Sequence, residues 1–150
     1  MNKEYFILSI EDSEADFTLL EKAVGQIKNR NIRIKNIGSG DKGIDFIFKN
    51  NEFKDAKTPD IIILDLNLPV IDGFEILKRV KQDKELRNIP IIIYSTSSEQ
   101  IDIWSSYKFY ANSYISKSFE VKDHYKKITS LCEYWFDTSK LSDNNYSPKK

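Results

Sequence analysis

The segment PDIIILDLNLPVIDGFEIL, residues 59–77, decides the fold expected for this chain. It opens with an apolar run, residues 61–66, that only Asp65 interrupts. Such a run, without polar alternation, is typical of a strand buried on both faces of a parallel sheet. After Asp72, apolar residues recur at helical spacing at Phe74 and Leu77. The segment therefore predicts a buried parallel strand, a loop that begins at Asp65, and a helix.

The same alternation of apolar runs and helical patterns extends through the rest of the chain. Four further apolar runs occupy residues 5–10, 32–37, 91–94 and 113–115. Helical patterns follow each run, and the first of them begins after Ser13, a good N-cap residue. Five strands that alternate with five helices predict a doubly wound α/β sandwich.

Length and composition narrow the class of protein. The 150 residues fit one domain, which we assign to residues 1–136, followed by a polar and flexible tail at 137–150. The chain is 40% hydrophobic and 31% charged, as in soluble globular proteins. Its 23 basic and 23 acidic residues give no net charge, so we expect neither nucleic acid nor a membrane as a partner.

Three further features of the sequence exclude other classes. The first apolar run, between Glu4 and Glu11, is too short for a signal peptide or a spanning helix, so we expect a cytoplasmic protein. Cys132 is the only cysteine, which excludes an intramolecular disulfide. His124 is the only histidine, which argues against an ordinary catalytic triad and a multi-histidine metal site.

Polar side chains follow four of the predicted strands, at the points where the strands end. They are Glu11 and Asp12, Asp65, Ser95 and Thr96, and Lys117. Because ligands of open α/β sheets bind at the carboxyl ends of the strands, we expect these side chains to share one edge. Each alone is explained as a helix cap or a solvated loop residue. Clustered carboxylates, however, repel one another unless a cation compensates their charge.

The chemistry of this set favours phosphoryl transfer. Oxygen ligands without cysteine or histidine suit Mg²⁺. A carboxylate beside Mg²⁺ can act as a nucleophile toward phosphorus, and the metal and a lysine would neutralise the transferring group. We therefore predict Mg²⁺-dependent phosphoryl chemistry on Asp65.

These motifs resemble the receiver domain of response regulators over about residues 5–136. The resemblance is carried by ILSIEDSEAD (7–16), PDIIILDLNLPVIDGFEIL (59–77), IPIIIYSTSS (89–98) and ANSYISKS (111–118). The second motif is the most specific, because Pro69 and Gly73 follow Asp65 by four and eight residues, as in the family's phosphorylation loop. The resemblance implies a flavodoxin-like fold with the strand order 2-1-3-4-5.

The resemblance also implies roles for the residues at the predicted edge. Asp65 would accept a phosphoryl group, while Glu11, Asp12, Asp65 and the backbone carbonyl of Asn67 would hold Mg²⁺. Lys117 would bind the phosphoryl group. The protein would be a phosphoacceptor switch of a bacterial two-component system, not an enzyme, although it would phosphorylate itself from a donor and lose the phosphate by hydrolysis.

The resemblance also implies that two residues transmit the effect of phosphorylation at Asp65 to the rest of the domain. Ser95 matches the switch hydroxyl of the family and Tyr114 the switch aromatic, although an aromatic in the last strand is as often simply part of the core.

Residues 45–69 and 106–118 are closer to stand-alone receivers, notably those partnered with phytochrome-type histidine kinases. This similarity implies a sensor histidine kinase as partner and no attached output domain. The receiver's own surface would then carry the output. We expect docking or a homodimer through the fourth helix, fifth strand and fifth helix, near Trp104, Tyr107 and Tyr110, unless these rings pack inward.

The chain departs from the family pattern at two positions. Ser118 stands where most receivers have a proline after a cis bond, and we expect the Lys117–Ser118 bond to be cis despite a cost of about 3–4 kcal/mol for a non-proline residue. Tyr110 stands where many receivers have glycine. A tyrosine there adopts a positive φ only at a cost, and it adds an aromatic side chain to a surface often used for partners.

Two alternative functions remain open at the level of sequence. A phosphatase of the haloacid dehalogenase type also uses an aspartyl nucleophile with Mg²⁺, but it normally has a second aspartate two residues later, where this chain has Asn67. A pseudo-receiver would bind partners without phosphorylation, which the departure at Ser118 leaves open. Incorporation of one phosphate, turnover of phosphomonoesters, or neither would distinguish the three functions.

Overall fold

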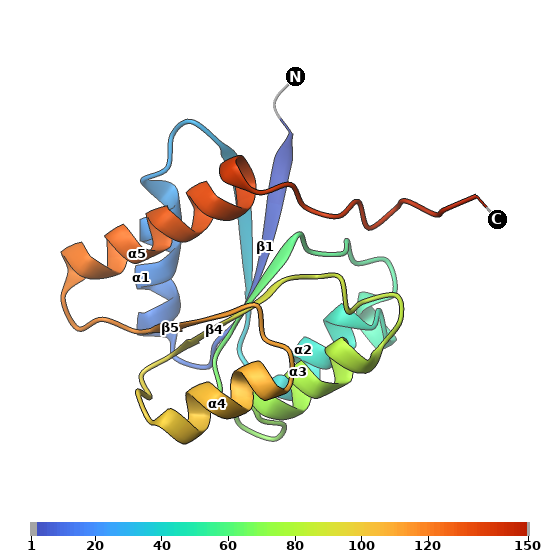
Figure 1. Cartoon of the computed structure of the whole chain (residues 1–150), viewed down its shortest axis with the longest axis horizontal. Coiled ribbons are helices and arrows are strands. Elements are labelled where there is room, and N and C mark those ends of the chain that lie inside the picture. The colour runs from blue at the N-terminus through green and yellow to red at the C-terminus, as the bar shows by residue number, and fades with distance from the viewer. Residues whose placement is uncertain (1–2, 150) are drawn as a thin grey trace.

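The computed structural model describes residues 3–149 and contains a central parallel sheet with helices on both faces (Figure 1). The strands are β1 (Glu4–Ile10), β2 (Asn31–Ile37), β3 (Ile61–Leu64), β4 (Ile91–Ser95) and β5 (Ser113–Ser116). All neighbouring strands pair in parallel, in the order β2-β1-β3-β4-β5. The predicted doubly wound, flavodoxin-like order is confirmed.

Five α-helices cover the sheet as two layers. They are α1 (Glu14–Gly25), α2 (Gly40–Ile47), α3 (Gly73–Gln82), α4 (Gln100–Lys108) and α5 (Val121–Glu133). Figure 1 shows α1 and α5 together on one side of the sheet and α2, α3 and α4 on the other. A short 3₁₀ turn (Asn51–Phe53) precedes β3, and a π-helical turn (Tyr134–Thr138) follows α5.

The isoleucine-rich strands supply the cores on both faces. Ile61 and Ile63 of β3 pack with α1 and α5, whereas Ile62 and Leu64 pack with α2 and α3. Their exposed fractions are 2% or less. Because each such side chain contributes about 1.5–3 kcal/mol when fully buried, the unbroken run fixes β3 between two helical layers. This burial holds the end of β3, and therefore Asp65, at a defined place.

Side-chain caps start the two helices that flank the carboxyl edge of the sheet. The Ser13 hydroxyl accepts a hydrogen bond from the Asp16 N–H at 3.2 Å, at the start of α1. The Asp72 carboxylate accepts one from the Glu75 N–H at 3.0 Å, at the start of α3. A cap of this kind contributes about 1 kcal/mol because it satisfies an otherwise unpaired amide.

The chain beyond α5 runs along the opposite, amino-terminal edge of the sheet. Asp137 forms an ion pair with Arg30, Leu141 contacts the core, and the Asn144 side chain donates to the Pro59 carbonyl at 3.3 Å. The flexibility of residues 137–150 stays a prediction. Between residues 3 and 149, no helix is both long and apolar enough to span a membrane.

At the end of α4, Tyr110 adopts a positive φ despite the cost of this conformation for a tyrosine. Its φ is 72°, in the left-handed region. The Tyr110 N–H donates to the Tyr107 carbonyl at 3.0 Å and the Ala111 N–H to the Ser106 carbonyl at 2.9 Å. These two bonds form a Schellman motif, in which the left-handed position is usually glycine. The hydrogen bonds to these two carbonyls at the helix end therefore outweigh the conformational cost of a left-handed tyrosine.

Replacing this residue should therefore stabilise the protein. We expect Tyr110→Gly to raise the free energy of unfolding by about 1 kcal/mol, because the left-handed conformation costs a non-glycine residue about 1–2 kcal/mol. Urea denaturation would measure the change. As a control, Tyr107→Gly, one turn earlier within the helix, should lower the free energy of unfolding by about 1 kcal/mol. A loss of stability in Tyr110→Gly would contradict this account of the helix end.

Candidate metal and phosphoryl site

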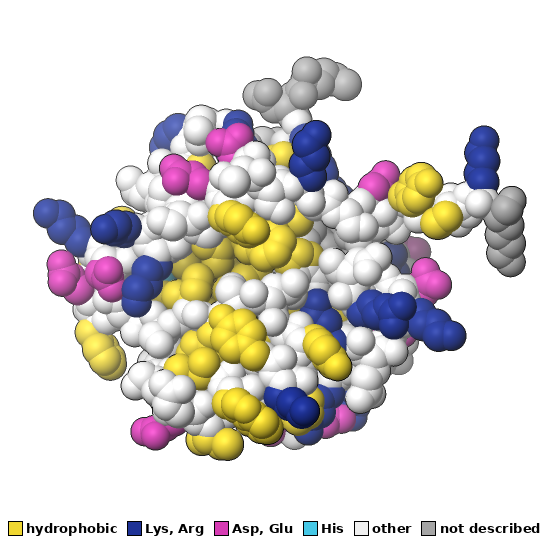
Figure 2. All heavy atoms as spheres, in the orientation of Figure 1, with side chains coloured by type: hydrophobic (Ala, Val, Ile, Leu, Met, Phe, Trp, Pro, Cys, Tyr) yellow, Lys and Arg dark blue, Asp and Glu magenta, His cyan; other side chains and the backbone are white. Residues whose placement is uncertain are grey.

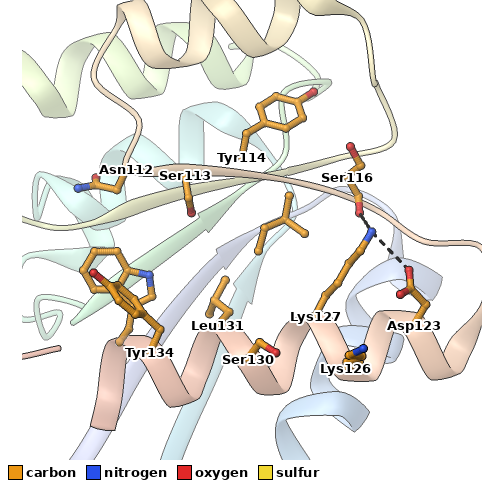
Figure 3. A pocket seen from close by; sticks show the side chains of 12 residues that line it. Asn112, Ser113, Tyr114, Ser116, Asp123, Lys126, Lys127, Ser130, Leu131 and Tyr134 are labelled. Atoms are coloured by element: carbon orange, nitrogen blue, oxygen red, sulfur yellow. Dashed lines mark hydrogen bonds and ion pairs between the residues drawn. The ribbon is translucent and has the colours of Figure 1, made fainter. Parts of the chain in front are cut away.

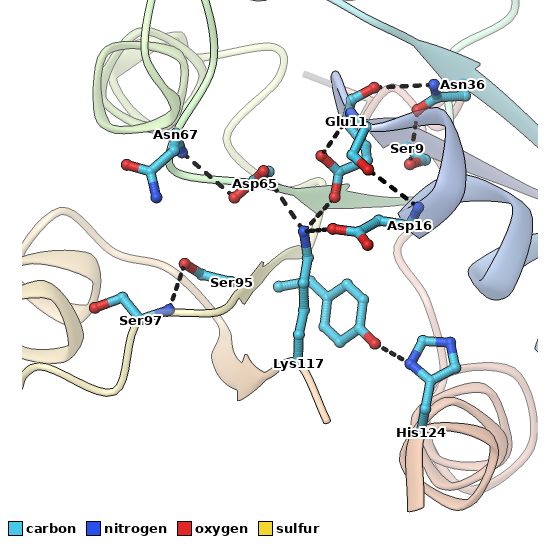
Figure 4. A network of polar contacts seen from close by, with 12 residues as sticks. Ser9, Glu11, Asp16, Asn36, Asp65, Asn67, Ser95, Ser97, Lys117 and His124 are labelled. Carbon is cyan, nitrogen blue, oxygen red and sulfur yellow. Dashed lines mark hydrogen bonds and ion pairs between the residues drawn. The ribbon is translucent and has the colours of Figure 1, made fainter. Parts of the chain in front are cut away.

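The predicted residues meet at the carboxyl edge of the sheet. Glu11 follows β1 directly, Asp65 follows β3, and Lys117 follows β5. Their side chains point toward one another (Figure 4). Both carboxylates are buried, with exposed fractions of 5% for Glu11 and 8% for Asp65. The parallel topology therefore brings together groups that are far apart in the sequence.

The acidic residues present a set of donors that fits a divalent cation. One carboxylate oxygen each from Glu11, Asp12 and Asp65 lies within 4.8 Å of the others. Asp12 is exposed at the mouth of the site. All three donors are oxygens, as Mg²⁺ and Mn²⁺ prefer. The Asn67 N–H donates to Asp65 Oδ1 at 3.3 Å, which fixes the loop that carries the Asn67 carbonyl next to this cluster.

The charges in the site are unbalanced without such a cation. Burial raises the pKa of Glu11, the hydrogen bond from Lys117 opposes this, and the neighbouring Asp65 raises the pKa further, to about 7. The Lys117 ammonium is therefore not enough to offset two buried carboxylates together with Asp12. A bound divalent cation would supply the missing positive charge.

Lys117 is held by more groups than the sequence predicted. Its ammonium donates to Glu11 and, at 2.9 Å, to Asp16 Oδ2, and it lies 3.6 Å from Asp65 Oδ2. Burial lowers the pKa of Lys117, but the hydrogen bonds to Glu11 and Asp16 and the charge of Asp65 raise it above its ordinary value overall. The ammonium is therefore charged at neutral pH. Asp16 was not among the predicted site residues.

The peptide bond between Lys117 and Ser118 contradicts the sequence prediction. No cis peptide bond occurs within residues 3–149, so this bond is trans. A cis bond before a non-proline residue costs about 3–4 kcal/mol, and the lysine reaches Glu11 from the trans backbone. The Ser118 hydroxyl instead accepts a hydrogen bond from the Glu120 N–H at 3.2 Å, just before α5.

Ser95 and Tyr114 are linked through the loop that follows β4. The Ser95 side chain is fully buried, and its hydroxyl accepts a hydrogen bond from the Ser97 N–H at 3.2 Å. The Tyr114 hydroxyl donates to the Ser97 carbonyl at 2.8 Å. Tyr114 is half-buried and packs against the core that α2 and α3 share. The two predicted switch residues therefore contact the same residue of one loop.

A buried pair that the sequence did not predict lies behind Lys117. The Lys117 ammonium is 5.6 Å from the centre of the Tyr94 ring, and the Tyr94 hydroxyl is hydrogen-bonded to His124 Nδ1 on α5 (Figure 4). The exposed fractions are 4% for Tyr94 and 1% for His124. Among residues 3–149, His124 Nε2 has no hydrogen-bond partner. Tyr94 lies in an apolar run, which predicts only a buried core residue. The sequence therefore contains no indication of the contact between Tyr94 and His124.

The burial of His124 predicts a loss of stability in mild acid. Burial lowers the pKa of His124 in the folded protein. The Leu19 backbone and the charge of Asp16 oppose this, and Lys117 and Lys127 reinforce it. The unfolded chain has a pKa of about 6.5 at this residue, so it binds more protons than the folded state as the pH falls below that value. Above pH ~6.5, His124 is neutral in both states and does not lower the free energy of unfolding. As the pH falls from ~6.5 toward the lower pKa of His124 in the folded protein, the free energy of unfolding decreases.

The variant Tyr94→Phe/His124→Phe removes the titrating group and its partner together. We expect urea midpoints of this variant to fall less than those of the wild type between pH ~7.5 and ~5.5, because only the wild type must protonate a buried histidine on unfolding. Carboxylates titrate in both proteins and cancel in the comparison. Equal slopes in the two proteins would show that His124 does not contribute.

A five-stranded flavodoxin-like sheet with an acidic cluster and a lysine at its carboxyl edge defines a class of phosphoacceptor switches. The chain belongs to the response regulator receiver domain family, whose model matches residues 7–129. Receiver domains bind a divalent metal, are phosphorylated by histidine kinases and act as phosphoacceptor switches, not as classical enzymes.

The proteins to which the chain is similar include a cyanobacterial phytochrome response regulator. Response regulator Rcp1 of Synechocystis sp. is 32% identical over 142 residues, which cover 93% of this chain and 95% of Rcp1. The crystal structure of the phosphorylated cyanobacterial phytochrome response regulator RcpA has a TM-score of 0.90 and 31% identity, and the match covers 94% of this chain and 100% of RcpA. The Mn²⁺-bound form of Rcp1 has a TM-score of 0.87 and 31% identity, covering 93% and 99% of the two chains.

Proposed function

We propose that this chain is a switch that accepts a phosphoryl group on Asp65 from a histidine kinase, with Mg²⁺ held by Glu11, Asp12, Asp65 and the backbone carbonyl of Asn67. The observation that carries the proposal is the cluster of three carboxylates beside the Lys117 ammonium at one edge of the sheet. The similarity to Rcp1 and RcpA supports a phytochrome-type kinase as the donor.

The proposed reaction transfers a phosphoryl group between two protein side chains. A carboxylate oxygen of Asp65 bonds to phosphorus while the phosphorus–nitrogen bond of the donor phosphohistidine breaks, and its electron pair stays on the donor imidazole. A bound Mg²⁺ would neutralise charge on the phosphoryl oxygens. Lys117 supplies a second positive charge, 3.6 Å from Asp65 Oδ2. Hydrolysis of the acyl phosphate would return the switch to its first state.

The local structure supports this function over the two alternatives. A phosphatase of the haloacid dehalogenase type would need an aspartate as general acid two positions after Asp65. That residue is Asn67, whose exposed amide does not exchange a proton at neutral pH. A pseudo-receiver would need neither the acidic cluster nor the lysine beside it, and both are present.

The contacts of Ser97 provide a route from Asp65 to the surface. Phosphorylation takes the charge of Asp65 from −1 to about −2 and adds strong acceptors, which would draw the Ser95 hydroxyl toward the phosphoryl group. That movement breaks the hydrogen bond from the Ser97 N–H. Since the Ser97 carbonyl also holds the Tyr114 hydroxyl, the loop and the tyrosine would move together.

The surface that this movement would change is rich in exposed apolar side chains. Side chains on α4 and just after it point outward, with exposed fractions of 65% for Ile101, 60% for Trp104, 49% for Tyr107 and 75% for Tyr110. Hydrophobic side chains reach the surface over and between α4 and α5 (Figure 2). The exposure of Trp104 argues against the inward packing that the sequence left open. Exposed aromatics of this kind favour a protein partner or a second copy of the chain.

An open groove continues this surface between β5 and α5. Its volume is about 810 Å³, and Figure 3 shows Lys127, Leu131 and Tyr134 among the side chains that line it. Lys127 crosses the groove, donating to the Ser116 carbonyl at 2.9 Å and lying 3.4 Å from Asp123. Tyr114 belongs to the β5 wall of the groove, but its ring lies on the opposite face of β5, toward the core that α2 and α3 share (Figure 3). We assign the output to this face of α4, β5 and α5.

A single incubation distinguishes the three functions. With acetyl phosphate and Mg²⁺, we expect intact-mass analysis to show one phosphoryl adduct per chain. A phosphomonoester offered in excess should not be turned over. Turnover of the ester would establish a phosphatase, and absence of both adduct and turnover would establish a pseudo-receiver.

A further inference from the structure

We propose that Asp16 is a positioning residue, which holds the Lys117 ammonium in the unphosphorylated protein and competes for it with the phosphoryl group on Asp65. The inference rests on the proposed function, because it concerns the state of Lys117 before and after phosphorylation. It adds a residue of α1 to a site otherwise built from the ends of β1, β3 and β5.

The distances show that Lys117 is drawn away from the phosphoacceptor. The ammonium donates to Glu11 and, at 2.9 Å, to Asp16 Oδ2, whereas Asp65 Oδ2 is 3.6 Å away and beyond hydrogen-bond range. Asp16 contacts the ammonium from α1, and Asp65 contacts it from β3 (Figure 4). Because a charge-assisted hydrogen bond needs about 2.7–2.9 Å, Lys117 must move before it binds a phosphoryl oxygen on Asp65 closely.

Burial decides which of the two carboxylates releases the ammonium. The side chain of Glu11 is 6% exposed, so loss of Lys117 would leave a buried carboxylate without its cation. The side chain of Asp16 is 41% exposed, so water can replace the lysine there at little cost. Asp16 is therefore the contact that Lys117 exchanges for the phosphoryl group.

The backbone of Asp16 is fixed well enough for this role. Its N–H donates to the Ser13 hydroxyl that caps α1, at 3.2 Å, and leaves the carboxylate free to bind Lys117. The cap uses the amide of Asp16 and not its side chain, so Asp16→Asn should leave the start of the helix intact. Glu14, in the same first turn, is exposed and makes no ion pair among the described residues. It provides a matched acidic control.

The test measures binding of beryllofluoride, a stand-in for the phosphoryl group, in the presence of Mg²⁺. We expect Asp16→Asn to bind it about twofold to fivefold more tightly than Glu14→Gln by calorimetric titration, the range typical of a partly exposed ion pair. The Glu14→Gln control accounts for the general effect of removing one negative charge. In a Lys117→Met background, where no ammonium can be released, Asp16→Asn should have no further effect.

The outcomes separate this inference from the proposed function. If the wild type neither binds beryllofluoride nor takes up phosphate, the proposed function fails. If the wild type binds it and Asp16→Asn binds no more tightly than Glu14→Gln, Asp16 does not compete for Lys117. Persistence of the effect in the Lys117→Met background would also overturn the inference, because the effect would then not act through the lysine.

Discussion

Asp65→Ala should abolish the phosphoryl adduct under conditions in which the wild type acquires one. The neighbouring Glu11 is a poor substitute, because its Oε1 accepts from Lys117 and its Oε2 from the Ser13 N–H at 3.2 Å. Asp65 is less occupied, with one hydrogen bond of 3.3 Å to Oδ1 and the lysine 3.6 Å from Oδ2. Among residues 3–149, Asp65 therefore combines a carboxylate oxygen without a close hydrogen bond with proximity to both the ammonium and the acidic cluster.

Intact-mass analysis after incubation with acetyl phosphate and Mg²⁺ measures this loss directly. The control Asp55→Ala removes an exposed acid from the loop before β3 and should be phosphorylated like the wild type. Chelation of divalent cations should suppress the adduct in the wild type, since the metal balances the charge of the three carboxylates. An undiminished adduct in Asp65→Ala would contradict the assignment of Asp65 as the acceptor. The urea midpoint of this variant shows whether it is folded.

The sequence predicts most of the fold because the signals are local. The apolar run at residues 61–64 is long enough to require burial on both faces, and the alternation of runs and helical patterns leaves little choice of topology. The topology then places Glu11, Asp65 and Lys117 at one edge, since all follow parallel strands. Confirmation of the strand order therefore supports the site as well as the fold.

The sequence could not predict features that depend on how elements pack. Asp16 lies on a helix, and which face of α1 meets Lys117 depends on the angle at which the helix crosses the sheet. The Tyr94–His124 pair joins residues 30 positions apart on two layers. The positive φ of Tyr110 follows from the hydrogen bonds at the end of α4, which outweigh the preference of the residue. Each is a consequence of tertiary contacts, which propensities do not encode.

Gly73→Ala should lower the free energy of unfolding by about 3 kcal/mol or more, because the new methyl group meets backbone on two sides. A Cβ at this position would lie 2.2 Å from the Asp65 carbonyl oxygen and 2.7 Å from Leu66 Cα. The Gly73 N–H also donates to the Leu66 carbonyl at 2.9 Å, so the start of α3 is held against the segment that carries the phosphoacceptor. Relief of the overlap requires movement of α3 or of Asp65.

Gly25→Ala provides the matched control, because a Cβ there has no neighbour within 4 Å. At the end of α1 it should be neutral or stabilising by up to about 1 kcal/mol. Urea denaturation would measure the free energy of unfolding of both variants. Incubation with acetyl phosphate would measure the rate of phosphorylation of the folded fraction of Gly73→Ala. Because relief of the overlap moves either α3 or the Asp65 backbone against which α3 packs, we expect that folded fraction to be phosphorylated more slowly than Gly25→Ala. Equal stability and equal phosphorylation in the two variants would show that the close contact between α3 and the Asp65 backbone is not required.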